Sequence, residues 1–285
     1  MADQSRKRFV TTRVEVEGRE DIKVVELPSR EPDPWGDDAK LTVVGTSVTR
    51  MDALEKVTGQ AKFTADLQRA GMGTIGGNLC QRPRCWYFRR GVQCFKNGGT
   101  FCPAVDGENQ YLAILDGGPC FIVHPSDPAV ALTALDAELE LTRSGSARRL
   151  PIHSFYVLPA ERMEHETVLP HGEFVSAVIL PVHAAGGRQH YHKLMQREAW
   201  DFALVSIAAC RREDGDVRLV LGGVAPRPWR VTSSVEEDVS SGGLDEDTIA
   251  TLADRALYDA RPLSKNAYKV DLAASLLRQA IAEIA

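Results

Sequence analysis

Residues 67–105 differ sharply in composition from the rest of this chain. They contain six basic residues, seven glycines and no acidic residue, although the whole chain has a formal net charge of −5. Glycine lets the backbone approach a ligand closely, and the excess of positive charge offsets an anion. The segment therefore has the character of a loop that receives phosphate groups. A solvated basic loop without a ligand is an equally simple interpretation.

Cysteines are concentrated in the same part of the chain. Five of the six fall within one 41-residue window, namely Cys80, Cys85, Cys94, Cys102 and Cys120. A disulfide framework is not expected, because the chain is large and shows no export signal; clustered cysteines then more often bind a metal or act in redox chemistry. The spacing C-x8-C-x7-C-x17-C from Cys85 onward matches neither zinc ribbons nor bacterial ferredoxins. Metal binding and burial in a core both stay open.

The length and composition are those of an ordinary globular protein. The 285 residues correspond to about two domains, and 44% are hydrophobic and 26% charged. A sequence pI near 5.8 argues against general nucleic-acid binding. There is no apolar run of the ~18 residues that a spanning helix needs, and no apolar stretch of a secretory signal near the start. A cytoplasmic protein is expected, or a periplasmic one if a partner carries the export signal.

The C-terminal third has the clearest secondary-structure pattern. Strands are predicted over residues 190–196, 202–210 and 217–221, with Asp214-Gly215 as a hairpin turn. Helices are predicted over 247–259 and 267–284, where apolar residues recur at helical spacing. A three-stranded antiparallel sheet backed by helices is an α+β arrangement.

The first two thirds of the chain are less regular. A capped helix is predicted over residues 129–137, after the turn His124-Pro125-Ser126-Asp127-Pro128, and strands are predicted over 139–142 and 174–180. Residues 1–40 are charged and hold three prolines, so an extended or partly ordered arm is expected, followed by a short strand over 41–45.

Several motifs occur in an order that resembles one family. Gly73-Thr74-Ile75-Gly76-Gly77-Asn78 is followed by Gln81-Arg82-Pro83-Arg84-Cys85-Trp86 and then by His124-Pro125-Ser126-Asp127. Arg197-Glu198-Ala199-Trp200-Asp201-Phe202 and Leu221-Gly222-Gly223-Val224-Ala225-Pro226 come later. This succession resembles the FAD-binding subunit of the molybdenum hydroxylases, which include xanthine dehydrogenase, aldehyde oxidoreductases and hydroxybenzoyl-CoA reductases. The resemblance runs from about Gly71 to the C-terminus.

The resemblance implies a set of residues that bind FAD. The backbone of Gly73, Thr74, Ile75, Gly76, Gly77 and Asn78 would hold the pyrophosphate, and Asp127 would bond the ribityl or ribose region. Lys193 and Arg197 would lie near the isoalloxazine, where a cation favours the anionic reduced flavin; their spacing places both on one face of a strand. A helix N-cap is the structural alternative for Asp127, and an exposed strand face for the two cations. His190 and His192 are expected to be half-buried polar residues.

The resemblance also implies a metal cluster. Cys85, Cys94, Cys102 and Cys120 match four cysteines that hold an additional 4Fe–4S cluster in part of the family, and the neighbouring cations would stabilise an all-thiolate cluster. Zinc is the competing metal. Cys80 has no counterpart in the family and is expected to be either a buried small residue or a bystander. Cys210, inside an apolar strand, is expected to be a core residue.

The implied function is electron transfer. Electrons from a molybdenum centre would pass through iron–sulfur clusters to FAD and then to an external acceptor, in a heterotrimer with a molybdenum-cofactor subunit and a 2Fe–2S subunit. No catalytic residue for the organic substrate is expected here, because that pocket would belong to the molybdenum-bearing partner. Two other functions stay open: a truncated fusion remnant that assists assembly without binding FAD, and a zinc-stabilised interaction module.

The N-terminal part departs from the family pattern. Residues 44–66 resemble the opening of the molybdenum-binding subunit, where the family normally supplies an earlier glycine-rich FAD loop. The expected division is an arm over residues 1–70, a FAD-binding subdomain with the four-cysteine insertion over 71–181, and a C-terminal α+β domain over 182–285. Weakened FAD affinity is expected, because half of the phosphate-binding backbone would be lost.

Overall fold

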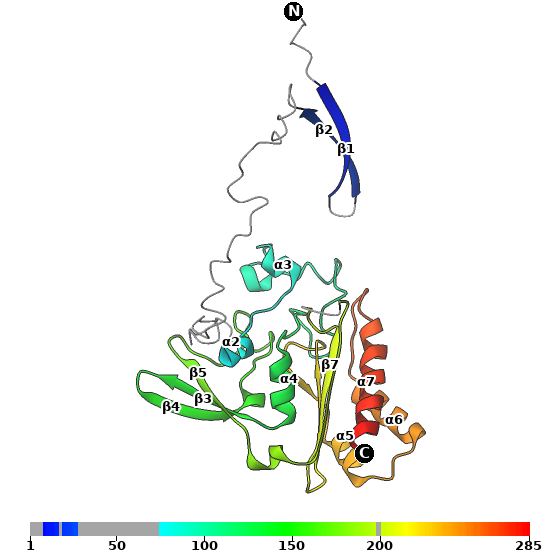
Figure 1. Ribbon diagram of the computed structural model, residues 1–285. Coiled ribbons are helices and arrows are strands. Elements are labelled where there is room, and N and C mark those ends of the chain that lie inside the picture. The colour runs from blue at the N-terminus through cyan, green and yellow to red at the C-terminus, as the bar shows by residue number, and fades with distance from the viewer. Residues whose placement is uncertain (1–7, 17–18, 28–73, 198–200) are drawn as a thin grey trace, which may run out of the picture. The chain divides into compact units, whose positions relative to one another are not determined.

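The computed structural model describes residues 8–16, 19–27, 74–197 and 201–285, and the chain divides into two compact units, Met1–Ala61 and Lys62–Ala285. In the first unit, β1 (Arg8–Val16) pairs antiparallel with β2 (Arg19–Leu27) (Figure 1). This part of the expected arm is therefore a β-hairpin. The strand predicted over residues 41–45 and the segment 44–66 lie outside the described residues.

The larger sheet of the second unit has the strand order β6-β7-β8-β9 and is antiparallel throughout. Its strands are β6 (Arg188–Leu194), β7 (Val205–Arg211), β8 (Val217–Gly222) and β9 (Trp229–Arg230). The three predicted strands and the Asp214-Gly215 turn are confirmed, with shifts of up to three residues at their ends. The predicted count of three strands is wrong, because the two-residue β9 is too short to show a period.

Both faces of this sheet are buried. On one face, Val205, Ile207 and Ala209 of β7 join the main core beneath α5 (Ser233–Ser241), α6 (Glu246–Ala256) and α7 (Tyr268–Ile284). On the other face, Ala208 packs with α4 (Asp127–Ala134). Figure 1 shows α4 and α7 on opposite sides of β7. A strand covered on both faces is a continuous apolar run, as the sequence of β7 is. The helices predicted over 247–259 and 267–284 are confirmed, whereas α5 was not predicted.

A smaller sheet lies on the far side of α4, with the order β4-β3-β5. Its strands are β3 (Glu138–Arg143), β4 (Ser146–Pro151) and β5 (Phe174–Ile179). Leu139 and Leu141 of β3 enter a second core with Leu79 and Phe155. β4 was not predicted, because almost all of its side chains are exposed and it lacks apolar alternation. The α+β class is confirmed.

Short helices alone interrupt the irregular course of residues 74–125. They are α2 (Ile75–Leu79), α3 (Trp86–Arg89) and η1 (Phe95–Asn97); η2 (Ile152–Ser154) and η3 (Val182–Ala185) follow later in the chain. Among the described residues, no helix has the length and hydropathy to cross a membrane.

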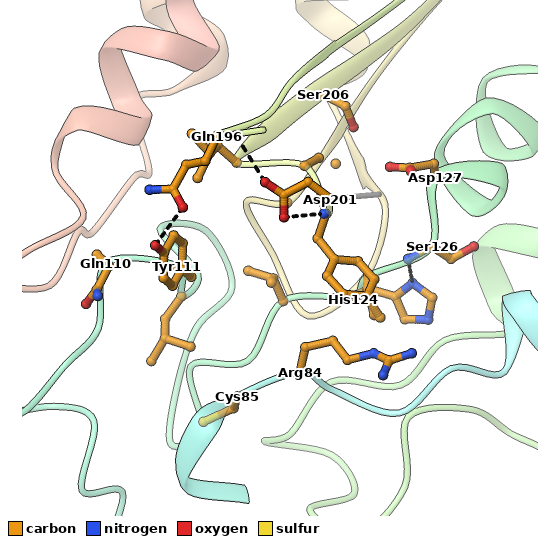
Figure 2. Close-up of a pocket in the computed structure, with 18 of the residues that line it drawn as sticks. Arg84, Cys85, Gln110, Tyr111, His124, Ser126, Asp127, Gln196, Asp201 and Ser206 are labelled. Carbon is orange, nitrogen blue, oxygen red and sulfur yellow. Dashed lines mark hydrogen bonds between the residues drawn. The ribbon is translucent and has the colours of Figure 1, made fainter. Parts of the chain in front are cut away.

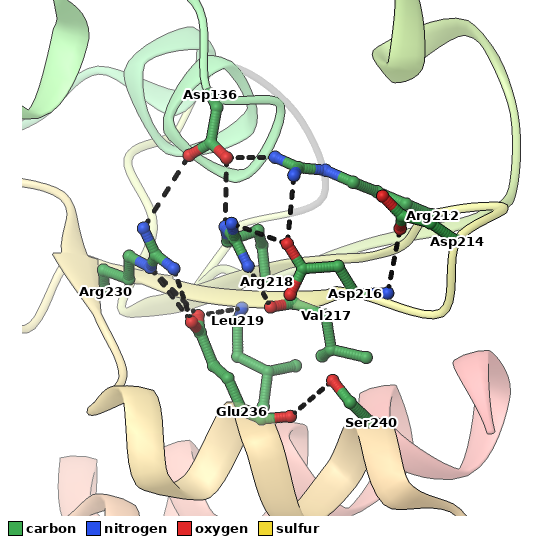
Figure 3. A network of polar contacts seen from close by, with 10 residues as sticks. All are labelled: Asp136, Arg212, Asp214, Asp216, Val217, Arg218, Leu219, Arg230, Glu236 and Ser240. Atoms are coloured by element: carbon green, nitrogen blue, oxygen red, sulfur yellow. Dashed lines mark hydrogen bonds and ion pairs between the residues drawn. The ribbon is translucent and has the colours of Figure 1, made fainter.

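Buried charges join the layers around β8 (Figure 3). Glu236 of α5 accepts the backbone N–H of Leu219 at 2.9 Å and the Arg230 guanidinium at 2.7 Å. Asp136, just after α4, accepts Arg218 Nε at 3.0 Å and also contacts Arg212. Each of the two carboxylates is bound by at least two donor groups. These donors balance the negative charges where the fold removes them from water.

Candidate functional site

A cavity of about 360 Å³ opens beside the ends of β7 and β8. Its walls come from segments far apart in the chain (Figure 2): residues 84–86, 108, 110–112, 123–127, 196–197, 201–204 and 222–223, with Val130 and Ser206. The volume lies in the range of small-molecule pockets, which occur where separate elements converge.

Aromatic rings supply much of the cavity wall. Trp86 and Tyr111 meet edge to face, with ring centroids 5.5 Å apart. The Arg84 guanidinium lies over the ring of Phe202, 5.0 Å from its centroid. Rings and a stacked guanidinium are surfaces on which a planar aromatic ligand can pack.

Asp127 is held in place by Lys193. The Lys193 ammonium donates to Asp127 Oδ2 at 2.7 Å and to the backbone carbonyl of Asp201 at 2.7 Å. The alternative of an exposed strand face for Lys193 is wrong, since only 19% of its side chain is exposed. The N-cap alternative for Asp127 is also wrong: Ser126 is the N-cap, its Oγ accepting the Ala129 N–H at 3.1 Å, and Asp127 is the first residue of α4.

Arg197 lines the cavity with Asp127, but it is not on the strand that carries Lys193. β6 ends at Leu194, so the predicted common strand face is wrong. Arg197 lies instead beyond the end of the strand, and the Asp201 carboxylate accepts the backbone N–H groups of Gln196 and Arg197 at 3.2 and 3.1 Å. These two hydrogen bonds hold the Arg197 backbone beside the cavity.

His124 forms a wholly buried part of the wall. Burial lowers its pKa to about 4, so the imidazole is neutral at pH 7. Its Nδ1 accepts the Ser126 N–H at 3.3 Å, which assigns the ring proton to Nε2.

His190 and His192 are half-buried, as predicted, and their ring centroids are 6.2 Å apart.

Three buried polar atoms of the cavity wall lack a hydrogen-bond partner within the described residues: Gln110 Oε1, His124 Nε2 and Ser206 Oγ. Buried polar groups are nearly always paired, and exceptions call for a ligand or a water. A side chain on Gly222 would also collide here, because an added Cβ would lie 2.4 Å from Ser206 Oγ. The cavity thus has unused donors and acceptors for a polar ligand.

The glycine-rich segment lies next to the cavity without lining it. Gly73 is outside the described residues, and Thr74 caps α2 by accepting the Gly77 N–H at 3.0 Å. Gly76 packs so closely on β5 that an added Cβ would lie 3.0 Å from the Val175 carbonyl oxygen. Asn78 reaches the cavity indirectly, accepting the hydroxyl of the cavity residue Ser126 at 2.6 Å.

A second, small cavity is lined by all four predicted cluster ligands, Cys85, Cys94, Cys102 and Cys120. Cys85 lines both cavities. Burial raises the pKa of the Cys120 thiol to about 12, an effect that the nearby Lys96 opposes, and burial also raises the pKa of Cys85. Within the described residues, no three His, Cys, Asp or Glu side chains form a group that could hold a metal ion. The convergence of the four cysteines is observed, but a metal site is not.

The two other cysteines lie elsewhere. Cys210 is buried in β7, as predicted for a core residue. Cys80 is half-buried beside the second core, and burial raises its pKa to about 11. No pattern in the sequence indicated Tyr111 as a cavity residue or Lys96 and Lys269 as buried residues. A lysine in a buried position carries no local signal that separates it from a surface lysine.

Comparison with known proteins gives consistent matches along the chain. Residues 38–183 match the FAD binding domain in molybdopterin dehydrogenase, and residues 190–284 match the CO dehydrogenase flavoprotein C-terminal domain. The aldehyde oxidoreductase FAD-binding subunit PaoB of Escherichia coli (strain K12) is 37% identical over 220 residues, which are 76% of this chain and 67% of that protein.

Comparison with solved structures also gives matches, two of which have the following TM-scores. Quinoline 2-oxidoreductase from Pseudomonas putida 86 has a TM-score of 0.44 at 22% identity, over 66% of this chain and 61% of that one. Carbon monoxide dehydrogenase from Hydrogenophaga pseudoflava has a TM-score of 0.46 at 22% identity, over 63% and 60%. The chain thus spans about three-fifths of the length of these structures.

Proposed function

This chain belongs to the family of FAD-binding subunits of molybdenum hydroxylases, and from that membership we propose that it binds FAD in the cavity beside β7 and β8 and transfers electrons through it. When bound, FAD would supply the redox chemistry, accepting electrons from a partner and passing them to an external acceptor. No residue of this chain is assigned a bond-making role on an organic substrate.

The main support for FAD binding is that Asp127 and Arg197, which are 70 positions apart in the chain, line the same cavity. Both were expected near the flavin from the sequence. The aromatic wall fits a planar ring, and the three partnerless polar atoms fit the many donors and acceptors of FAD. These features support a flavin as the ligand.

The residues of the cavity divide into binding and positioning groups. Trp86, Tyr111 and the Arg84–Phe202 pair would pack against the flavin ring, and Arg197 would provide a cation beside it. Lys193 would act through Asp127, whose carboxylate it holds at 2.7 Å. We also propose, from the sequence resemblance, that the segment next to the cavity contacts the pyrophosphate. This segment consists of Gly73, Thr74, Ile75, Gly76, Gly77 and Asn78.

We further propose that Cys85, Cys94, Cys102 and Cys120 hold a 4Fe–4S cluster. The support is that the four side chains, from segments up to 35 positions apart, line one small cavity beside Lys96. A zinc ion requires four ligands at about 2.3 Å from one point, whereas a four-iron cluster fills the space between more widely separated thiolates. Binding would require the thiols with raised pKa values to lose their protons.

Partner subunits are part of the proposal. PaoB is described as the FAD-binding subunit of an aldehyde oxidoreductase, and by analogy this chain would associate with a molybdenum-cofactor subunit and a 2Fe–2S subunit. The organic substrate would bind to the molybdenum-bearing partner. We place this assembly in the cytoplasm, or in the periplasm if a partner carries the export signal.

Titration of the flavin-free full-length chain with FAD tests the first proposal. Saturable quenching of flavin fluorescence at one FAD per chain is expected, with an affinity below that of the longer relatives. Asp127→Asn should weaken binding, and Asp247→Asn, at an exposed position of α6 that does not line the cavity, should leave it unchanged. Absence of any saturable binding would support the alternative of an assembly remnant.

Metal analysis of the anaerobically purified chain tests the second proposal. About four irons per chain and a broad visible absorption are expected. Replacing any of the four proposed ligands by Ser should reduce the iron content, whereas Cys80→Ser and Cys210→Ser should not. One zinc per chain in a colourless protein would contradict the cluster and support the interaction module.

A further inference from the structure

A short segment before and at the start of α7 holds one wall of the FAD cavity through a series of hydrogen bonds. Residues 264–269 bind residues 109–113 almost one to one: the Lys265 N–H donates to Asn109 Oδ1, the Tyr268 hydroxyl to the Gln110 carbonyl, the Lys269 ammonium to the Tyr111 carbonyl, and the Asn266 amide to the carbonyls of Leu112 and Ala113. Residues 109–113 belong to the FAD-binding match and residues 264–269 to the C-terminal match.

Lys269 is the member of this series that also reaches a second wall. Its ammonium donates to the Tyr111 carbonyl at 2.9 Å and to the Gly223 carbonyl at 2.8 Å. Tyr111 and Gly223 belong to different chain segments, and both line the same cavity. Lys269 thus ties the Tyr111 wall directly to the end of β8, next to the place where the N–H groups of Ile114 and Leu115 bind the Val224 carbonyl at 2.8 and 3.0 Å.

This ammonium is in an unfavourable place for stability alone. Lys269 is 1% exposed, and within the described part of the chain no carboxylate forms an ion pair with it. Burial accordingly lowers its pKa to about 7. Taking a charge out of water costs free energy, and two neutral carbonyls compensate it less well than a carboxylate does.

Gly223 shows why the Lys269 contact has consequences at the cavity. Its φ of +73° is left-handed, and an added Cβ would lie 2.8 Å from the Leu204 carbonyl oxygen. The turn after β8 is therefore tightly packed on the residues that lead into β7, and Leu204 lines the cavity too. Moving the Gly223 carbonyl would move this packed turn.

We propose that Lys269 is a positioning residue for FAD: it fixes the Tyr111 wall and the Gly223 turn at the separation that admits the flavin. The inference rests on the proposed function, because it assumes that FAD occupies this cavity. It adds that a side chain of α7, outside the cavity itself, determines how tightly the cofactor is held.

The test compares three variants of the full-length chain by FAD titration and by thermal unfolding without flavin. Lys269→Met keeps the length and apolar stem of the side chain but removes its donors, and it should weaken FAD binding by about tenfold or more. The melting temperature of the flavin-free chain should stay the same or rise. Lys269→Gln keeps an amide donor and should recover part of the affinity.

Leu277→Ala is the matched control. Leu277 is a wholly buried core residue two turns further along α7 and does not line the cavity. It should lower the melting temperature and leave FAD affinity unchanged, which separates loss of positioning from loss of stability. If Lys269→Met fails to fold, Lys269→Gln is judged by the same two measurements.

The outcomes are distinguishable. Wild-type affinity in Lys269→Met would overturn the inference and leave the proposed function intact. Equal weakening by Lys269→Met and Leu277→Ala would also overturn it, because the role would then be structural. A wild-type chain that binds no FAD would overturn the proposed function and the inference together.

Discussion

The layer formed by β6–β9 and α5–α7 and the irregular segment of residues 80–125 are held together in different ways. In the layer, alternate residues of β7 and β8 enter a continuous apolar core. In the irregular segment, buried polar side chains hold the backbone: Asn109 and Asn266 bind carbonyls, and Lys96 and Glu166 form a buried ion pair. The first kind of order comes from periodic apolar residues, and the second from individual long-range hydrogen bonds.

The largest effect is expected in the layer. Leu219 lies in the middle of β8, is wholly buried and packs in the main core. Leu219→Ala should lower the free energy of unfolding by about 3 to 5 kcal/mol, since it removes buried apolar atoms and leaves a cavity. Urea denaturation measures this. A loss below about 2 kcal/mol would mean that the layer is not held chiefly by its core.

A somewhat smaller loss is expected when the irregular segment loses its buried ion pair. Glu166 accepts Lys96 Nζ at 2.8 Å and Arg82 Nε at 2.9 Å, and only 1% of the Lys96 side chain is exposed. Glu166→Gln leaves that ammonium without a counter-charge, which should cost about 3 kcal/mol.

The double variant Lys96→Met/Glu166→Gln is the control for this prediction. It removes the charge together with its partner, so most of the stability should return. If the double variant is no more stable than Glu166→Gln alone, the charge is not what makes the pair necessary.

The same contrast explains what the sequence could predict. The strands and helices of the C-terminal layer follow from apolar periodicity in β7, β8, α6 and α7. The short β9 and the exposed β4 carry no such pattern and were missed. The strands and helices of the layer could be predicted because each one is encoded by apolar periodicity within its own short segment.

For the site, the sequence supplied residues but not their arrangement. Asp127 and Arg197 were expected near the ligand and line the cavity, and Lys193 holds Asp127 from behind. The role of Lys269 depends on a contact 158 positions away, with Tyr111. No periodicity or spacing reports such a pairing, because it exists only after both segments have folded.

Acid should destabilise the irregular segment through His124. Burial lowers the pKa of this histidine in the folded chain to about 4, against 6.5 for the ordinary group. Between these values the unfolded chain binds more protons, so stability falls as the pH falls from about 6.5 to 4. At 1.36 kcal/mol per pKa unit, the loss reaches roughly 3 kcal/mol at pH 4.

Urea denaturation across this pH range compares the wild type with His124→Asn and with the exposed His153→Asn. The slope against pH should be reduced only in His124→Asn. An equal slope of the free energy of unfolding against pH in all three proteins would assign the acid sensitivity to other groups. His124 would then not be one of the buried polar residues that stabilise this segment.

The smallest effect is expected from an ion pair of the same chemistry on the surface of the smaller sheet. Arg148 of β4 donates to both carboxylate oxygens of Glu173, at 2.9 and 2.7 Å, which raises the pKa of Arg148 and lowers that of Glu173. Nearly half of the Arg148 side chain is exposed, against 1% for Lys96, so water screens its charge and Arg148→Ala should lower the free energy of unfolding by only about 0.5 kcal/mol. Added salt should reduce this difference further. The two carboxylates are about equally buried, with 7% of the Glu173 and 8% of the Glu166 side chain exposed, so the pairs differ chiefly in the burial of the cation. A loss for Arg148→Ala as large as that for Glu166→Gln would show that hydrogen-bond geometry, not burial of the cation, decides what a charge pair contributes in this protein.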